Sequence, residues 1–159
     1  MLTSLWIMRH GLAVDHFDSD FSRQLSDVGS LQVFDVVQQL IQDSDKLPTD
    51  MLVSPFARTQ STAQIVHQKL ALAHPFKTEE MLVHFADHKI LGDYLLASDY
   101  KDLMIVSHMP IVANLCQYLS SGCEVFGFKT AQLVRMDFVQ NSHNLLVGKI
   151  GKVYLPQNF

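Results

Sequence analysis

Three short apolar segments of this chain each end abruptly in a polar turn, and a helical pattern follows each turn directly or after a loop. The three segments are residues 5–8, 51–53 and 103–106. Buried strands that alternate with helices form a mainly parallel sheet with helices on both faces. Residues 131–138 and 145–154 instead alternate around a turn at 140–142, which predicts antiparallel strands at an edge. With a further short strand at 81–83, we expect an α/β fold of about six strands.

Four segments have the periodicity of amphipathic helices. Ser26 can cap the first helix, and Pro110 suits the first turn of the fourth helix. The second, third and fourth helices are expected over residues 58–72, 88–96 and 111–119. The core-facing positions of the first helix are predicted to be Leu31, Phe34, Val37, Leu40 and Ile41, and those of the second Ala63, Ile65, Val66 and Leu70. Phe34, Phe128 and Phe138 are interpreted as core residues.

The size and charge of the chain exclude several classes of protein. Its 159 residues match one ordinary domain, so we expect residues 1–159 to form a single domain. The formal net charge of −4 argues against nucleic acid or an anionic membrane as a partner. We expect no membrane span and no secretory signal. Cys116 and Cys123 form no zinc pattern, so a cytoplasmic protein is expected, with a single disulfide between them as an open alternative.

The polar turns carry the residues with chemical potential. They hold Arg9, His10 and Gly11 in the first turn, Ser54 to Arg58 in the second, and Ser107 and His108 in the third. Parallel strands end at the same edge of a sheet, where α/β proteins bind their ligands. Two arginines and two histidines are therefore expected in one electropositive pocket. Because guanidinium forks match the oxygens of a phosphoryl group, phosphate is the expected ligand.

His10 is the candidate nucleophile of this pocket. A neutral imidazole can attack phosphorus if an acceptor holds its other ring nitrogen, and the product is a phosphohistidine. Gly11 is expected to let the backbone approach the phosphate closely, because it has no side chain. His108 is expected to donate a hydrogen bond to a phosphoryl oxygen.

The same residues resemble the motifs of the histidine phosphatase superfamily. Residues 8–11 are similar to its Arg-His-Gly signature, 53–63 to its second motif, and 106–108 to its last. The resemblance implies a phosphoglycerate mutase-like fold in which His10 is the nucleophile, Arg9 and Arg58 bind phosphate, and His108 completes the pocket. Residues 23–29 and 128–131 make the chain most similar to the SixA group of phosphohistidine phosphatases. Further candidate substrate-binding residues are Gly11, Arg23, Ser107 and Thr130.

Two departures from the larger members of the superfamily bear on the substrate. Arg58 and His108 lie only 50 positions apart, which leaves no room for the helical lid of those members and implies an open site. Met81 stands near the position where the family carries an acidic residue, so the general acid is Glu80, Asp87 or absent. Phosphohistidine depends least on such an acid, because its P–N bond is labile.

We therefore expect a phosphatase acting on a protein phosphohistidine, in a phosphotransfer domain or a phosphocarrier. The alternatives are a broad-specificity phosphatase of small phosphate monoesters and a non-catalytic phosphate-binding adaptor. No cofactor is expected.

His84 and His88 are four apart with Asp87 between them, but they lack an evident third ligand. They are interpreted as surface or packing residues, and no metal is expected.

Overall fold

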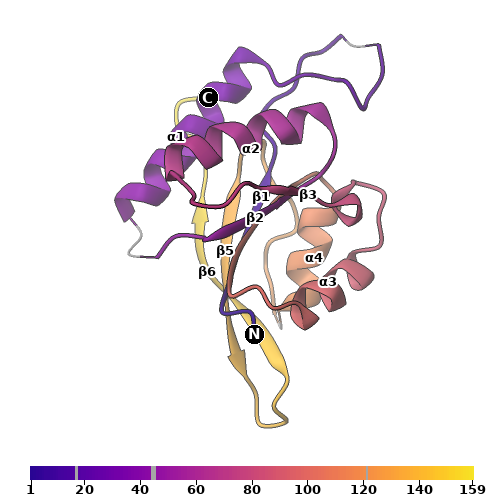
Figure 1. Cartoon of the computed structure of the whole chain (residues 1–159), viewed down its shortest axis with the longest axis vertical. Coiled ribbons are helices and arrows are strands. Elements are labelled where there is room, and N and C mark those ends of the chain that lie inside the picture. The colour runs from indigo at the N-terminus through magenta and orange to yellow at the C-terminus, as the bar shows by residue number, and fades with distance from the viewer. Residues whose placement is uncertain (17, 44–45, 121) are drawn as a thin grey trace.

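Six strands form one mixed sheet in the computed structural model, which describes residues 1–16, 18–43, 46–120 and 122–159 (Figure 1). In spatial order they are β3 (Lys77–Thr78), β2 (Asp50–Val53), β4 (Asp102–Ser107), β1 (Ser4–Arg9), β5 (Leu133–Gln140) and β6 (Leu146–Tyr154). The first four are mutually parallel, whereas β5 pairs antiparallel with β1, and β6 antiparallel with β5. The expected parallel sheet with an antiparallel edge is confirmed.

Helices cover both faces of this sheet (Figure 1). α1 (Asp27–Asp43) and α2 (Ala57–Leu70) pack together on one face, and α3 (His88–Ala97) and α4 (Ile111–Leu119) on the other. Side chains of a strand point alternately to its two faces. Leu5 and Ile7 of β1 therefore join the core beneath α3 and α4, while Trp6 and Met8 join the core beneath α1 and α2. None of the described helices is long and apolar enough to cross a membrane.

α1 begins where expected but buries a different face. The Ser26 hydroxyl accepts a hydrogen bond from the Gly29 amide at 3.0 Å, as an N-cap does. The buried apolar residues of α1 are Val33, Val36, Val37 and Leu40. Leu31, Phe34 and Ile41 are exposed, so their assignment to the core was wrong. The apolar face predicted for α1 and the face that it buries are both spaced by three and four residues, so periodicity alone does not distinguish them. Phe34 instead lies beside α2, with Lys69 Nζ 3.6 Å from its ring centroid.

The other predicted elements need smaller corrections. In α2, Ala63 and Val66 are buried, whereas Ile65 and Leu70 are only partly buried. Phe128 and Phe138 lie in the core, as expected. The strand expected at 81–83 is wrong: Glu80–Leu82 forms a short 3-10 helix, η1, and the strand is β3 just before it. The Glu79 carboxylate accepts a hydrogen bond from the Met81 amide, which favours the helical turn.

The first polar turn, after β1, packs closely against the first turn of α1 at Gly11 and Gly29. A Cβ on Gly11 would lie 2.5 Å from the Gly29 carbonyl oxygen, and a Cβ on Gly29 would collide with the Leu12 backbone. Gly11 therefore makes room for α1, and its amide donates to Thr62 Oγ1 at 3.2 Å. That Gly11 also lets the backbone approach a phosphate stays a prediction.

We expect Gly29→Ala to lower the free energy of unfolding by about 1–3 kcal/mol, because backbone atoms of Leu12 cannot move aside cheaply. Urea unfolding measures this change. Gly127→Ala is the matched control, since the nearest atom to its Cβ is Met109 Cε at 3.9 Å, and its expected change is no more than about 1 kcal/mol. Equal changes in the two variants would contradict the close approach.

Candidate active site

The carboxyl ends of β1, β2 and β4 meet at one pocket of about 300 Å³. Arg9 of β1 lies opposite Ser107 of β4, and Val53 of β2 opposite Val106, so the three polar turns leave the sheet side by side. Six residues singled out in the sequence line this pocket: Arg9, His10, Arg23, Arg58, His108 and Thr130. The remaining lining residues are Leu12, Ala13, Asp20, His84 and Met109.

His10 has one nitrogen engaged and the other turned toward Arg58. Its Nδ1 lies 2.7 Å from the Gly11 carbonyl oxygen and must donate to it, so the lone pair is on Nε2. Arg58 Nε donates to this Nε2 at 3.2 Å. Burial lowers the pKa of His10 to about 3. The hydrogen bond to Gly11 raises this pKa, and the charge of Arg58 lowers it further. His10 is therefore neutral at physiological pH.

This lowered pKa predicts an acid-sensitive stability. The unfolded chain takes up a proton on His10 near pH 6.5, whereas the folded chain does so only near pH 3. The free energy of unfolding should therefore fall as the pH drops below 6.5, by about 2–3 kcal/mol from His10 at pH 4.5. His10→Gln should have a shallower fall in urea unfolding between pH 7 and pH 4.5. Parallel pH profiles of wild type and variant would contradict the neutral buried imidazole.

His108 packs edge-on against His10, with ring centroids 5.2 Å apart. Its Nε2 lies 2.7 Å from the Ser54 hydroxyl. Its Nδ1 is buried and has no hydrogen-bond partner among the described residues. Burial lowers the pKa of His108 to about 2, with further contributions from His10 and Arg58. Both histidines of the motifs are thus neutral.

Three arginines, Arg9, Arg23 and Arg58, make the pocket strongly cationic. Arg58 lies in the first turn of α2, where the helix dipole disfavours a positive charge, and Asp20 compensates it. Arg58 Nη1 donates to the Asp20 backbone oxygen at 2.8 Å and lies 3.3 Å from Oδ1. Arg9 Nη1 donates to the Phe128 carbonyl at 2.7 Å, while its buried Nε has no partner among the described residues. Burial and the charge of Arg58 lower the pKa of Arg9.

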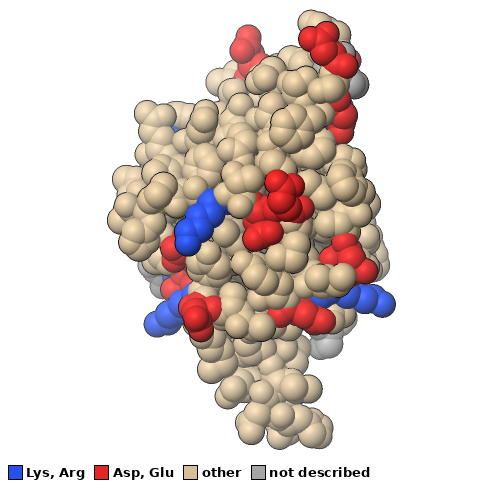
Figure 2. Space-filling model, turned by 45° about the vertical axis from the view of Figure 1, so that its right-hand side comes forward, with Lys and Arg blue, Asp and Glu red and all other residues tan. Residues whose placement is uncertain are grey.

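This positive charge is local. On the face shown in Figure 2, basic side chains are scattered singly among acidic ones and do not gather into a patch. The chain as a whole carries a formal net charge of −4. On that face, no broad basic surface is therefore available to bind an anion.

Four residues singled out in the sequence lie outside the pocket lining. Gly11 packs on α1, and the Ser107 hydroxyl turns away to donate to the Leu82 carbonyl at 2.6 Å. Glu80 is exposed on η1. Asp87 caps α3 by accepting hydrogen bonds from the Lys89 and Ile90 amides, and these bonds lower its pKa. Neither candidate acid is brought to His10.

Asp20 and His84 line the pocket and were missed by the sequence analysis. Asp20 is one of three aspartates in the loop before α1, and no motif distinguishes it. His84 and His88 were both interpreted as surface or packing residues. Because Asp87 caps α3, His84 precedes the helix and turns to the pocket, whereas His88 packs against Tyr118.

No group of three or more His, Cys, Asp or Glu side chains that could hold a metal occurs in the described ranges. Cys116 and Cys123 are both free thiols, and burial raises the pKa of Cys116.

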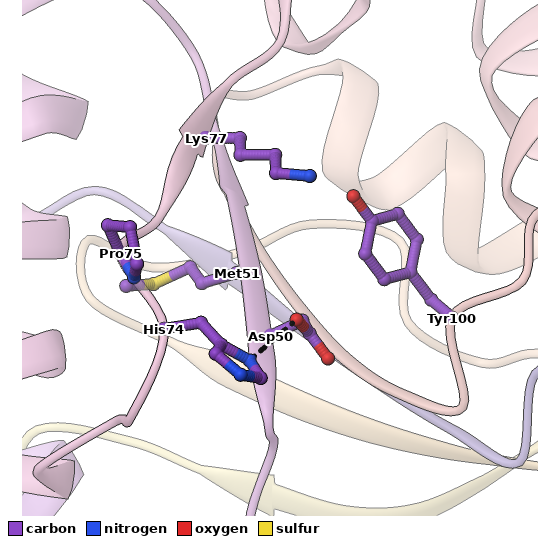
Figure 3. Close-up of a pocket in the computed structure, with 6 residues that line it drawn as sticks. All are labelled: Asp50, Met51, His74, Pro75, Lys77 and Tyr100. Atoms are coloured by element: carbon purple, nitrogen blue, oxygen red, sulfur yellow. Dashed lines mark ion pairs between the residues drawn. The ribbon is translucent and has the colours of Figure 1, made fainter.

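A second hollow of about 300 Å³ lies near the amino ends of β2 and β4 (Figure 3). Its lining residues are Asp50, Met51, His74, Pro75, Lys77 and Tyr100. His74 Nδ1 lies 3.5 Å from Asp50 Oδ1, an ion pair when the histidine is protonated. The hollow contains no arginine and none of the motif residues, so the candidate site remains at the opposite edge of the sheet.

The sheet and the pocket with its paired histidines and arginines define a protein of the histidine phosphatase fold class. No family model matches the chain. Over 159 residues it is 30% identical to the phosphohistidine phosphatase SixA homolog of Haemophilus influenzae, covering 94% of this chain and 97% of the relative. The chain belongs to the SixA phosphohistidine phosphatase family.

Solved structures agree with this assignment. The protein histidine phosphatase SixA complexed with tungstate superimposes with a TM-score of 0.85 and 25% identity over 98% of both chains. A putative phosphohistidine phosphatase SixA from Agrobacterium tumefaciens has the same fold, with a TM-score of 0.80, 18% identity, and coverage of 98% of this chain and 99% of that one. The fold and the family expected from the sequence are confirmed.

Proposed function

We propose that the chain hydrolyses phosphohistidine on a protein, such as a phosphotransfer domain or a phosphocarrier, through a phosphohistidine on His10. The observation that carries this proposal is the state of His10: Nδ1 donates to the Gly11 carbonyl, and the unprotonated Nε2 faces Arg58 at 3.2 Å. A neutral nitrogen inside a cationic pocket is a nucleophile placed for an anionic phosphoryl group. We place the reaction in the cytoplasm and assign it no cofactor.

The reaction has two steps in this proposal. Nε2 of His10 attacks phosphorus, the bond from phosphorus to the substrate nitrogen breaks, and water then hydrolyses the new phosphohistidine. Arg9, Arg58 and His108 bind the phosphoryl oxygens, where negative charge is spread in the transition state. In the free protein Arg58 Nε occupies the lone pair of His10. A bound phosphoryl group would draw the guanidinium to its oxygens and release that lone pair.

The surroundings of the pocket support a protein as the substrate. The chain between the second and third motifs builds β3, η1 and α3, and α3 packs against α4. Phe21 and Phe85, both more than half exposed, lie next to the pocket through contacts with Phe56 and His84. Exposed aromatic side chains are typical of protein interfaces. A relative in the same family is named for phosphohistidine.

The test compares two substrates with one preparation of the protein. We expect kcat/KM for a phosphotransfer domain that carries phosphohistidine to exceed that for p-nitrophenyl phosphate. A higher value for the ester would favour a small-molecule phosphatase instead. Binding of the phosphorylated domain without release of phosphate would identify a non-catalytic adaptor.

A further inference from the structure

His84 is a third histidine of the pocket, and the two steps above leave it without a role. Its side chain, between η1 and α3, is 33% exposed. Its ring packs edge-on against Phe56, Phe85 and His108, with centroid distances of 5.3, 5.0 and 5.4 Å. These contacts hold the imidazole next to the second histidine of the pocket.

The Nε2 atom of His84 lies near Asp20, the ion-pair partner of Arg58. Asp20 Oδ2 lies 4.0 Å from this Nε2 and 3.4 Å from Arg58 Nη2, so one carboxylate oxygen is close to both the imidazole and the guanidinium. His84 and Asp20 form an ion pair whenever the imidazole is protonated. The other nitrogen, Nδ1, is buried and unpartnered within the described ranges. Nε2 is therefore the atom that can exchange a proton with a bound substrate.

We propose that His84 carries the protons of the reaction, an inference that rests on the proposed transfer to His10. In the first step, Nε2 of His10 bonds to phosphorus, the bond to the leaving atom breaks, and protonated His84 gives its Nε2 proton to that atom. In the second step, water oxygen bonds to phosphorus, the bond to His10 breaks, and His84 takes the proton that water loses. Both histidines return to their starting states.

One residue can serve both steps because the geometry of displacement is the same in each. In an in-line reaction the leaving group and the attacking water take turns at the position opposite Nε2 of His10. The two acids expected from the sequence, Glu80 and Asp87, do not line the pocket. Imidazole is the most frequent proton-transfer group in enzymes, because it titrates near neutral pH.

The test is His84→Gln assayed with two aryl phosphates that differ in leaving group. Phenyl phosphate needs a proton on its leaving oxygen, and we expect its kcat/KM to fall by about 100-fold. Dinitrophenyl phosphate has a leaving group that needs no proton, and its kcat/KM should change by less than about 3-fold. With this second ester the variant should show a burst of dinitrophenolate, because hydrolysis of the phosphorylated enzyme has lost its base.

The matched control is His88→Gln, four residues along and outside the pocket, which should leave both esters unaffected. Retained kcat/KM for dinitrophenyl phosphate also demonstrates that His84→Gln folds. Equal losses for both esters, or no loss for phenyl phosphate, would overturn the role of His84. Wild type that turns over neither ester nor the phosphorylated domain would instead contradict the proposed function.

Discussion

His10→Ala is expected to abolish phosphate release, with kcat lowered by about 10³-fold or more, because the attacking Nε2 is absent. The arginines and His108 remain, so binding of tungstate or phosphate should persist. Phosphate release from a phosphohistidine protein measures the first effect, and calorimetry with tungstate the second. His143→Ala, in the exposed β5–β6 turn, is the control and should retain full activity. A His10→Ala variant with more than a tenth of wild-type activity would contradict the nucleophile.

Arg58→Lys should lower kcat/KM by about 10²-fold although it keeps the positive charge. Arg58 uses three nitrogens, with Nε on His10 and both Nη atoms on Asp20, and lysine offers only one. Loss of one oxyanion donor typically costs this much. Steady-state kinetics measures the change.

Arg135→Lys provides the comparison for Arg58→Lys. Arg135 is also ion-paired, to Asp137 at 3.0 Å, but it lies on β5 outside the pocket. We expect its kcat/KM to stay within about 2-fold of wild type. If Arg58→Lys were as mild as this control, fork-like binding of the phosphoryl group by Arg58 would be excluded.

The parts of the fold that could be predicted are those with a strong local cause. Buried strands that stop at polar turns identified β1, β2 and β4, and parallel strands must end at one edge. This rule alone brought Arg9, His10, Arg58 and His108 together in the pocket.

The parts that failed depend on contacts between distant segments. The face of α1 is decided by its packing on the sheet, and Phe34 fits the same spacing as the buried Val33 and Val37. The close packing of Gly11 on Gly29, eighteen positions along, has no local signal in the sequence. Asp20 enters the site through an ion pair with Arg58 that no spacing could indicate.

The central claim is that His10 carries the phosphoryl group during turnover. Rapid mixing of wild type with a phosphohistidine protein, an alkaline quench and peptide mass spectrometry would locate the covalent phosphate. We expect one acid-labile, alkali-stable phosphoryl group on the peptide that contains His10, and none in His10→Ala. Phosphate on another residue, or full turnover by His10→Ala, would contradict the account.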